Sequence, residues 1–393
     1  ASTVRIQYAP TTDFLGAMDR QLTEKIGERI SVLDFGAVGD GTTDCSAAFN
    51  AAVTAASTST LGKTIYIPAC KSFYKLGSKV TINSSVPISF VGEGVGSLVK
   101  RTGTLNTYEG LFDVKSDNVT FYNFCIDGGT TIAATLSYNG AGTGTFNNDP
   151  MHSSLTLNTS VWLHGPVKNT TFAKMTFQHA GGYSILVDAT NGTPAGGSNS
   201  GKYDSGVYDI YNTRIINCDF LNNRPAIFSP YGGADGNYGS WNGGIFLNTY
   251  GKQDASNYLS TTYGTLIQGC FFRGNYGNCV WSHLYGFAVL HSDLRVIDNS
   301  FTDNGLDCIQ FGGVVGGAAI GNRFRRTGYI PNNRSADIGP TNLSVPRWDA
   351  TDGYYAVALD TSGIVKGVSY ANNTFISTNG GDIDADGFCD GSI

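Results

Sequence analysis

Short apolar segments alternate with polar turns along most of the chain, and one phrase recurs. A Phe is followed seven or eight residues later by a β-branched residue, with an Asn- or Gly-rich turn between them. The Phe positions are Phe177, Phe220, Phe272, Phe301, Phe324 and Phe375, and the β-branched positions are Ile185, Ile227, Val280, Ile309 and Ile383. The copy at Phe324 lacks the second element. Each half of the phrase is typical of a short strand bounded by a tight turn.

The spacing of the copies predicts a solenoid. Successive Phe positions lie 43, 52, 29, 23 and 51 residues apart, which fits a coil of about 23–29 residues with insertions in some coils. Short strands cannot bury their apolar side chains alone, so coils stack about 4.8 Å apart around one core. We therefore predict an all-β fold, a right-handed parallel β-helix, in which the Phe and the β-branched residues form two internal ladders. A β-sandwich does not predict a repeated phrase in register.

The segment before the repeats predicts different elements. Residues 46–56 are Ala-rich and follow the cap candidates Thr43 and Asp44, which predicts a helix. Residues 63–69, 79–82 and 88–94 have the pattern of strands. The run of DFGA, GDG and TD motifs, the helix, the YIP strand and the GEG turn resembles the opening of the pectate-lyase-like superfamily over residues 30–100. This resemblance implies that the helix caps the open N-terminal end of a β-helix.

We divide the chain into an N-terminal stem with a helix (1–29), a cap region (30–100) and a β-helix body with loop insertions (101–393). The charged stretch 13–29, placed directly before SVLDFGAVGDG, resembles bacteriophage tailspikes and capsule depolymerases. That resemblance implies a homotrimer located in the virion tail. It also implies a bacterial capsular polysaccharide or O-antigen as the partner.

Composition excludes several classes of protein. Lys and Arg number 25 against 31 Asp and Glu, a net charge of −6, whereas a protein that binds nucleic acid through phosphates is basic. With 12% aromatic and 14% charged residues the chain is not disordered, and no apolar stretch is long enough for membrane insertion. The eight cysteines include no C-x-x-C pair, and we interpret them as buried free thiols that fold in a reducing compartment, the host cytoplasm. We expect no secretion signal.

Side chains alternate along a strand, so the residues one and three positions after each β-branched residue point out of the core. They are Leu186, Asp188, Phe228, Pro230, Trp281, His283, Gln310, Gly312, Asp384 and Asp386. An aromatic surface beside Asp, His and Gln suits sugars, whose C–H faces stack on rings; a plain solvated face is the alternative. Insertions at 189–207, 231–262 and 329–366 are expected to line a groove for a polysaccharide chain.

Glycoside hydrolysis requires two carboxyl groups, about 6.5–9.5 Å apart in inverting enzymes. Asp303 and Asp307 flank a turn and are the candidate general acid and base, assisted by His283, although turn capping is an equal alternative for both. Trp281 and Gln310 are expected to position sugar rings. Residues 307–311 (DCIQF) resemble part of the DDC-I motif of polygalacturonase-like hydrolases, with Leu306 in place of the first Asp.

Asp384 and Asp386 also meet the inverting range, because residues two apart on one strand are separated by about 6.6–6.8 Å. Both are predicted to bind substrate. The D-x-D-x-D-G run from Asp382 also opens a calcium loop, but Ile393 stands where such a loop requires Glu. No metal site and no cofactor are predicted.

Two other functions remain open. A polysaccharide lyase needs a cation beside a uronate carboxyl and a base for the C5 proton. Arg273, Arg325 and Arg326, expected to bind substrate, and His283 supply these groups. A binding-only adhesin is the third possibility, and it forms no product.

Overall fold

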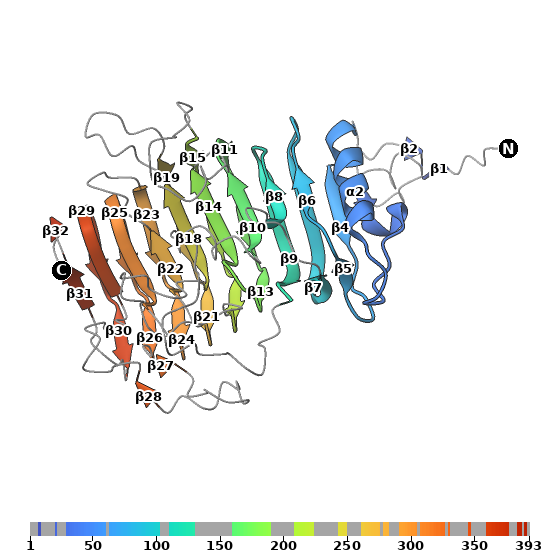
Figure 1. Ribbon diagram of the computed structural model, residues 1–393. Coiled ribbons are helices and arrows are strands. Elements are labelled where there is room, and N and C mark those ends of the chain that lie inside the picture. Colours follow the sequence, from blue (N-terminus) through green and yellow to red (C-terminus); the bar gives the residue numbers. More distant parts are fainter. Residues whose placement is uncertain are drawn as a thin grey trace, which may run out of the picture.

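The computed structural model describes residues 29–59, 63–102, 110–129, 159–189, 208–223, 243–249, 261–275, 278–282, 291–304, 307–326 and 359–376. It also describes the backbone of β1 (Gln7–Tyr8), β2 (Arg20–Gln21), β27 (Tyr329–Ile330), β28 (Val345–Pro346), β31 (Ile383–Asp386) and β32 (Cys389–Asp390). Within these ranges one sheet of 28 strands winds along the molecule from coil to coil, and its strand pairs are all parallel (Figure 1). The parallel β-helix is therefore confirmed.

Each full coil contributes to four rows of stacked strands. Row 1 contains β6 (Val80–Ile82), β8 (Gly110–Val114), β10 (Thr159–His164), β14 (Ile185–Ala189), β18 (Ile245–Thr249), β22 (Val280–Ser282), the starts of β25 (Ile309–Ile320) and β29 (Leu359–Ala371), and β31. Row 2 contains β11 (Val167–Lys168), β15 (Ile210–Tyr211), β19 (Thr262–Tyr263), the start of β23 (His291–Ile297), the middle parts of β25 and β29, and β32.

Rows 3 and 4 complete the coil. Row 3 contains β3 (Arg29–Ser31), β4 (Thr64–Ile67), the starts of β7 (Ile88–Arg101) and β9 (Val119–Asp127), β12 (Thr171–Ala173), β16 (Arg214–Ile216), β20 (Leu266–Gln268) and the ends of β23, β25 and β29. Row 4 contains β5 (Tyr74–Leu76), the ends of β7 and β9, β13 (Thr176–Gln178), β17 (Asp219–Leu221), β21 (Phe271–Arg273), β24 (Ser300–Thr302), β26 (Arg323–Arg325) and β30 (Thr374–Ile376).

The Phe ladder is confirmed in row 4. Rings of successive coils stack with centroids 4.6–5.1 Å apart from Phe177 through to Phe375. The second ladder is correct at Ile185, Val280, Ile309 and Ile383 but wrong at Ile227. Ile245 occupies that coil, because the chain returns to row 1 later than the repeated phrase suggests. Ile227 itself lies outside the described residues.

The left-handed backbone conformation at the corners of the coils explains the many Asn and Gly residues. The turn between rows 3 and 4 places one residue per coil at φ of 52–68°: Asn123, Lys174, Asn217, Gly269, Asp298, Gly321 and Asn372. Asn, Asp and Gly tolerate this left-handed conformation better than other residues. The residue after this position is Asn in three successive coils: Asn299, Asn322 and Asn373. Each Asn side chain accepts a hydrogen bond from the backbone N–H of the residue at the same corner of the preceding coil.

The predicted helix is α2 (Ser46–Thr58), which follows the short 3-10 helix η1 (Val32–Phe35). The N-cap is Cys45, not Thr43 or Asp44; Asp44, one residue earlier, accepts the backbone N–H of Ser46 at 2.9 Å. Phe49 packs its ring 5.9 Å from Tyr74 and 6.5 Å from Phe112, so the helix lies against the first coils at the N-terminal end (Figure 1). In the predicted helical stem, Arg20–Gln21 is instead a strand, antiparallel to β1; most of the stem lies outside the described residues.

The seven cysteines whose side chains are described are free thiols. Six of them are buried, as predicted, whereas Cys70 is half-buried. No helix in the described ranges is long and apolar enough to cross a membrane.

Candidate functional site

The structure separates the predicted site residues into two groups. Trp281 and Gln310 are neighbours in register on row 1. Arg273, Arg325 and Arg326 belong to row 4 and the corner after it. The sequence placed all of them in one groove, whereas the fold puts them on different rows.

The row-1 aromatic residues point out of the core as predicted, but they are buried. Trp281 is 5% exposed and stacks on Phe246 with ring centroids 4.3 Å apart. Both belong to a second apolar cluster, separate from the solenoid core, with Trp162, Tyr183 and Leu186. The expectation of an exposed aromatic surface is therefore wrong at Trp281, because alternation along a strand determines direction and not coverage. Gln310 is half-buried and accepts a hydrogen bond from Asn278 at 2.7 Å.

Asp303 is held by arginines. It is 3% exposed, sits at the corner after row 4 with φ 58°, and pairs with Arg326 through both carboxylate oxygens at 2.6 and 2.8 Å. Arg273 lies 4.0 Å from the same carboxylate. Asp307 is also buried, and its carbonyl accepts the Cys279 N–H.

Several predicted residues lie partly or wholly outside the described structure. His283, Phe228, Pro230 and Asp382 are not described. The backbones of Asp384 and Asp386 pair with Asp360 and Ser362, so both belong to row 1, but their side chains are not described. The predicted insertions at 231–262 and 329–366 each contain a row-1 strand, β18 and the start of β29.

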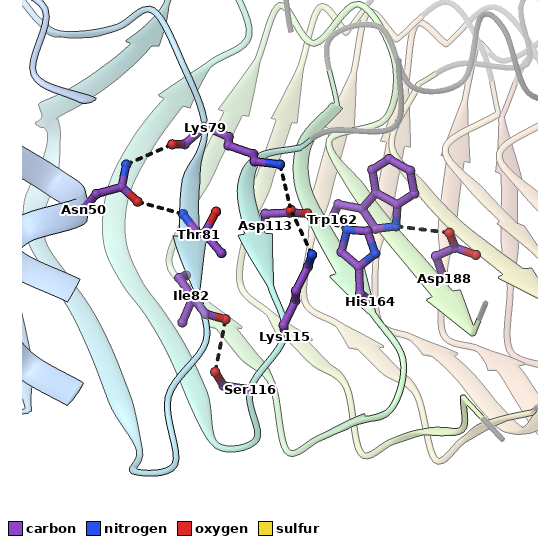
Figure 2. Close-up of polar contacts among 10 residues, drawn as sticks. All are labelled: Asn50, Lys79, Thr81, Ile82, Asp113, Lys115, Ser116, Trp162, His164 and Asp188. Atoms are coloured by element: carbon purple, nitrogen blue, oxygen red, sulfur yellow. Dashed lines mark hydrogen bonds and ion pairs between the residues drawn. The ribbon is translucent and has the colours of Figure 1, made fainter. Parts of the chain in front are cut away.

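A polar cluster lies on the outer side of row 1 (Figure 2), and the sequence pattern pointed to only one of its residues, Asp188. Trp162 and His164 of β10 are in register with Asp113 of β8 and Asp188 of β14, respectively. His164 Nε2 lies 2.5 Å from Asp113 Oδ1, and the Trp162 indole N–H donates to Asp188 at 3.1 Å. The rings of Trp162 and His164 stack with centroids 4.5 Å apart. We call these four residues the row-1 cluster.

The row-1 cluster is buried yet surrounded by charge. Asp113, His164 and Asp188 are 1%, 8% and 3% exposed. Lys79 and Lys115 each place Nζ 3.7 Å from Asp113, and their side chains are 35% and 45% exposed. Carboxylates at this depth are rare unless they are paired or functional. The cluster thus reaches the surface on its lysine side.

Hydrogen bonds from helix α2 fix the backbone at Lys79, beside the row-1 cluster. Asn50 donates to the Lys79 carbonyl at 2.9 Å and accepts the Thr81 N–H at 3.0 Å (Figure 2). Ser116, next to Lys115, donates to the Ile82 carbonyl at 3.0 Å. These bonds tie helix α2 to β6, and β6 to the segment directly after the strand that carries Asp113.

A signal for the row-1 cluster was present in the sequence. The ladder that contains Ile185 continues backwards through Val161 and Phe112. The rule of one and three positions, applied to these two residues, gives Trp162, His164, Asp113 and Lys115. Neither coil carries the repeated phrase, so the phrase does not point to these residues.

Within the described ranges, no group of three or more His, Cys, Asp or Glu side chains is arranged to hold a metal ion.

The comparisons with known proteins agree with the architecture. Residues 29–121 match the family model "Rhamnogalacturonase A/epimerase, pectate lyase-like". A search of curated proteins finds no match. Among solved structures, the chain is similar to the Agl-KA catalytic domain, with 16% identity, a TM-score of 0.52, and coverage of 91% of this chain and 55% of that domain.

Two further solved structures are similar to the chain. DFA-IIIase from Arthrobacter chlorophenolicus A6, in complex with GF2, has 16% identity, a TM-score of 0.51, and coverage of 89% and 80%. The tailspike protein of Acinetobacter baumannii phage AM24 has 15% identity, a TM-score of 0.49, and coverage of 89% and 45%. The chain thus spans less than two thirds of two of these three structures. At such identities the likeness concerns the fold: the chain is a parallel β-helix, and its residues 29–121 match a pectate-lyase-like family model.

Proposed function

We propose that this protein binds and cleaves a bacterial surface polysaccharide, capsule or O-antigen, by glycoside hydrolysis. The observation that carries the proposal is the row-1 cluster, in which the carboxylates of Asp113 and Asp188 lie on either side of β10. Hydrolysis of a glycosidic bond needs one carboxyl to protonate the leaving oxygen and another to activate water or attack the sugar. Asp113 and Asp188 together supply both roles, and Trp162 and His164 lie on the strand between them.

The register favours an inverting mechanism. From strand spacing and rise, the Cα atoms of Asp113 and Asp188 are on the order of 12 Å apart. Both carboxylates lean toward β10, because Asp113 contacts His164 and Asp188 contacts Trp162. The carboxyl groups are therefore closer together than their Cα atoms, which suits the wider inverting separation of about 6.5–9.5 Å better than the retaining one of about 5–5.5 Å.

Asp303, Asp307 and His283 remain candidate acid–base residues from the sequence, and Asp384 and Asp386 remain candidate substrate ligands. Trp281 and Gln310 continue the same row-1 register several coils beyond the row-1 cluster. A polysaccharide that follows row 1 meets Asp113 first and Gln310 later. The cleavage rates of Asp113→Asn and Asp303→Asn rank the two sets of carboxylates.

The proposal includes a homotrimer in a virion tail. Its support is the resemblance of the N-terminal run to tailspikes and depolymerases, together with buried free cysteines. Light scattering of the purified protein tests it, and a monomer contradicts this part of the proposal.

A lyase is the second candidate, and the lysines of the row-1 cluster favour it. Lys79 and Lys115 both approach Asp113, beside an imidazole able to accept a proton. Such a group of cations and base suits the neutralisation of a uronate carboxyl and the removal of its C5 proton. The product then carries an unsaturated uronate that absorbs ultraviolet light.

Incubation with capsules and O-antigens from a panel of bacteria tests the proposal. New reducing ends without ultraviolet absorbance support hydrolysis, and both signals together support a lyase. Binding without either signal leaves only the adhesin. Asp113→Asn and Asp188→Asn are the test variants, and Asp219→Asn is the matched control, since Asp219 is an exposed carboxylate on row 4.

A further inference from the structure

Three arginines gather at the row-4 corner, away from the row-1 cluster. Arg273 ends β21, Arg325 ends β26, and Arg326 follows at the corner with φ 49°. All three are exposed, and Asp303 lies buried beneath them. We call these four residues the arginine corner.

Asp303 lies on the coil between Arg273 and Arg326 and contacts both guanidinium groups. Thr302, the residue before it, pairs with Arg273 on one side and with Arg325 on the other. Arg326 donates one hydrogen bond, from Nη2 to Asp303 Oδ2 at 2.8 Å, and its Nε lies 2.6 Å from Oδ1 as an ion pair. A paired guanidinium of this kind is preorganised, so it loses less conformational freedom when it binds a ligand.

The charge balance of the arginine corner is positive in an acidic protein. Three arginines against one aspartate leave a charge of +2, whereas the whole chain carries −6. The side chain of Asp303 is 3% exposed, while those of Arg273 and Arg326 are 52% and 45% exposed. An arriving anion therefore meets guanidinium groups and not the carboxylate.

We propose that the arginine corner binds the acidic groups, carboxylate or phosphate, of an acidic polysaccharide, at a site separate from the row-1 cluster. Arg273 and Arg325 are two coils apart, about 10 Å along the solenoid. That distance lets them hold two successive acidic groups of one extended polymer. The inference goes beyond the proposed cleavage and concerns binding alone; it rests on the proposed function only for the choice of a polysaccharide.

Direct binding of defined polymers tests this inference. The probes are polygalacturonate for carboxylate, inorganic polyphosphate for phosphate and dextran as the neutral polymer, each measured at low and at physiological salt. We expect at least tenfold tighter binding of one or both anions than of dextran, weakened by salt. The two anionic arms identify which acidic group is preferred.

The double variant Arg273→Gln/Arg325→Gln removes two cations and leaves the pair of Arg326 with Asp303 intact. We expect it to bind the preferred anion at least tenfold more weakly, with an unchanged unfolding midpoint. Arg214→Gln is the control, because Arg214 is an exposed arginine on row 3. Equal binding of all three polymers by the wild type, or undiminished binding by the double variant, overturns the inference. Neither readout requires turnover, so a protein that cleaves nothing still tests it.

Discussion

Asp113 and Asp303 are both buried carboxylates outside the solenoid core, and both pair with side chains from neighbouring coils, but their partners differ in kind. Asp113 contacts an imidazole and two lysines. Asp303 contacts two arginines. An imidazole can donate or accept a proton, whereas a guanidinium keeps its charge. The same stacking of coils therefore builds one site suited to proton transfer and another suited to holding fixed charge.

The largest expected effect is a difference in cleavage rate between variants of the two carboxylates, Asp113 and Asp303. We expect Asp113→Asn to lower the rate of polysaccharide cleavage about 10²–10⁴-fold, since a positioned acid or base contributes about that much. Asp303→Asn is expected to lower it far less, because its carboxylate is already engaged by arginines. The measurement is the initial rate of reducing-end formation, with Asp219→Asn as the charge-matched control. The reverse order would reinstate Asp303 as the catalytic residue and break the comparison.

The next effect concerns stability at the arginine corner. Among the described residues, Arg326→Gln leaves the buried Asp303 with Arg273, 4.0 Å away, as its remaining ion-pair partner. We expect a loss of about 1–3 kcal/mol in the free energy of unfolding, less than for a fully buried pair because Arg326 is nearly half exposed. Urea unfolding measures it. Arg325→Gln, next in sequence and exposed, is expected to change stability by less than about 0.5 kcal/mol; equal losses in both variants would argue against a specific role for the pair.

A smaller effect tests the indole of the row-1 cluster. Trp162→Phe keeps an aromatic ring against His164 but removes the N–H that donates to Asp188. The net loss of one such hydrogen bond is about 0.5–1.5 kcal/mol, equivalent to a fall in turnover of up to about tenfold if the bond orients the carboxylate. Comparison of kcat and KM with wild type measures it. A change in KM alone would mean that Trp162 contributes to binding and not to the position of Asp188.

The smallest expected effect is on the acid dependence of unfolding, and it concerns a third buried carboxylate, Asp127. Burial acts to raise its pKa, but hydrogen bonds from His179, the Gly129 N–H and Gln178 outweigh burial and hold the pKa below its ordinary value of 3.8. A carboxyl with a lowered pKa stabilises the fold above the unfolded-state pKa, and this contribution is lost as the pH falls through the folded-state value. We expect Asp127→Asn to flatten the acid dependence of unfolding below about pH 4. An unchanged acid limb would mean that other carboxylates control it.

The sequence predicted the solenoid because its ladders repeat in register. Phe272 and Phe301 stack because each coil returns to the same point, and a repeated residue reports that return directly. The prediction at Ile227 is wrong for the opposite reason. A fixed spacing from Phe220 ignores the longer segment before the chain returns to row 1, where Ile245 occupies the ladder position.

The candidate site was less predictable because it depends on contacts between coils. Asp113 and His164 lie 51 residues apart in the sequence and meet only through the register of β8 and β10. Burial of Trp281 depends on what covers row 1, which alternation along a strand does not determine. The pairing of Asp303 with Arg326 likewise follows from a corner that stacks one coil on the next.

The central claim is that Asp113 and Asp188 form an inverting pair of carboxylates. Proton NMR of the first products from a polysaccharide that the wild type cleaves, recorded beside Asp188→Asn, tests this claim most directly. We predict that the new reducing ends first appear with inverted anomeric configuration and that Asp188→Asn produces almost none. Retained configuration, an unsaturated uronate or full activity of Asp188→Asn would contradict the account.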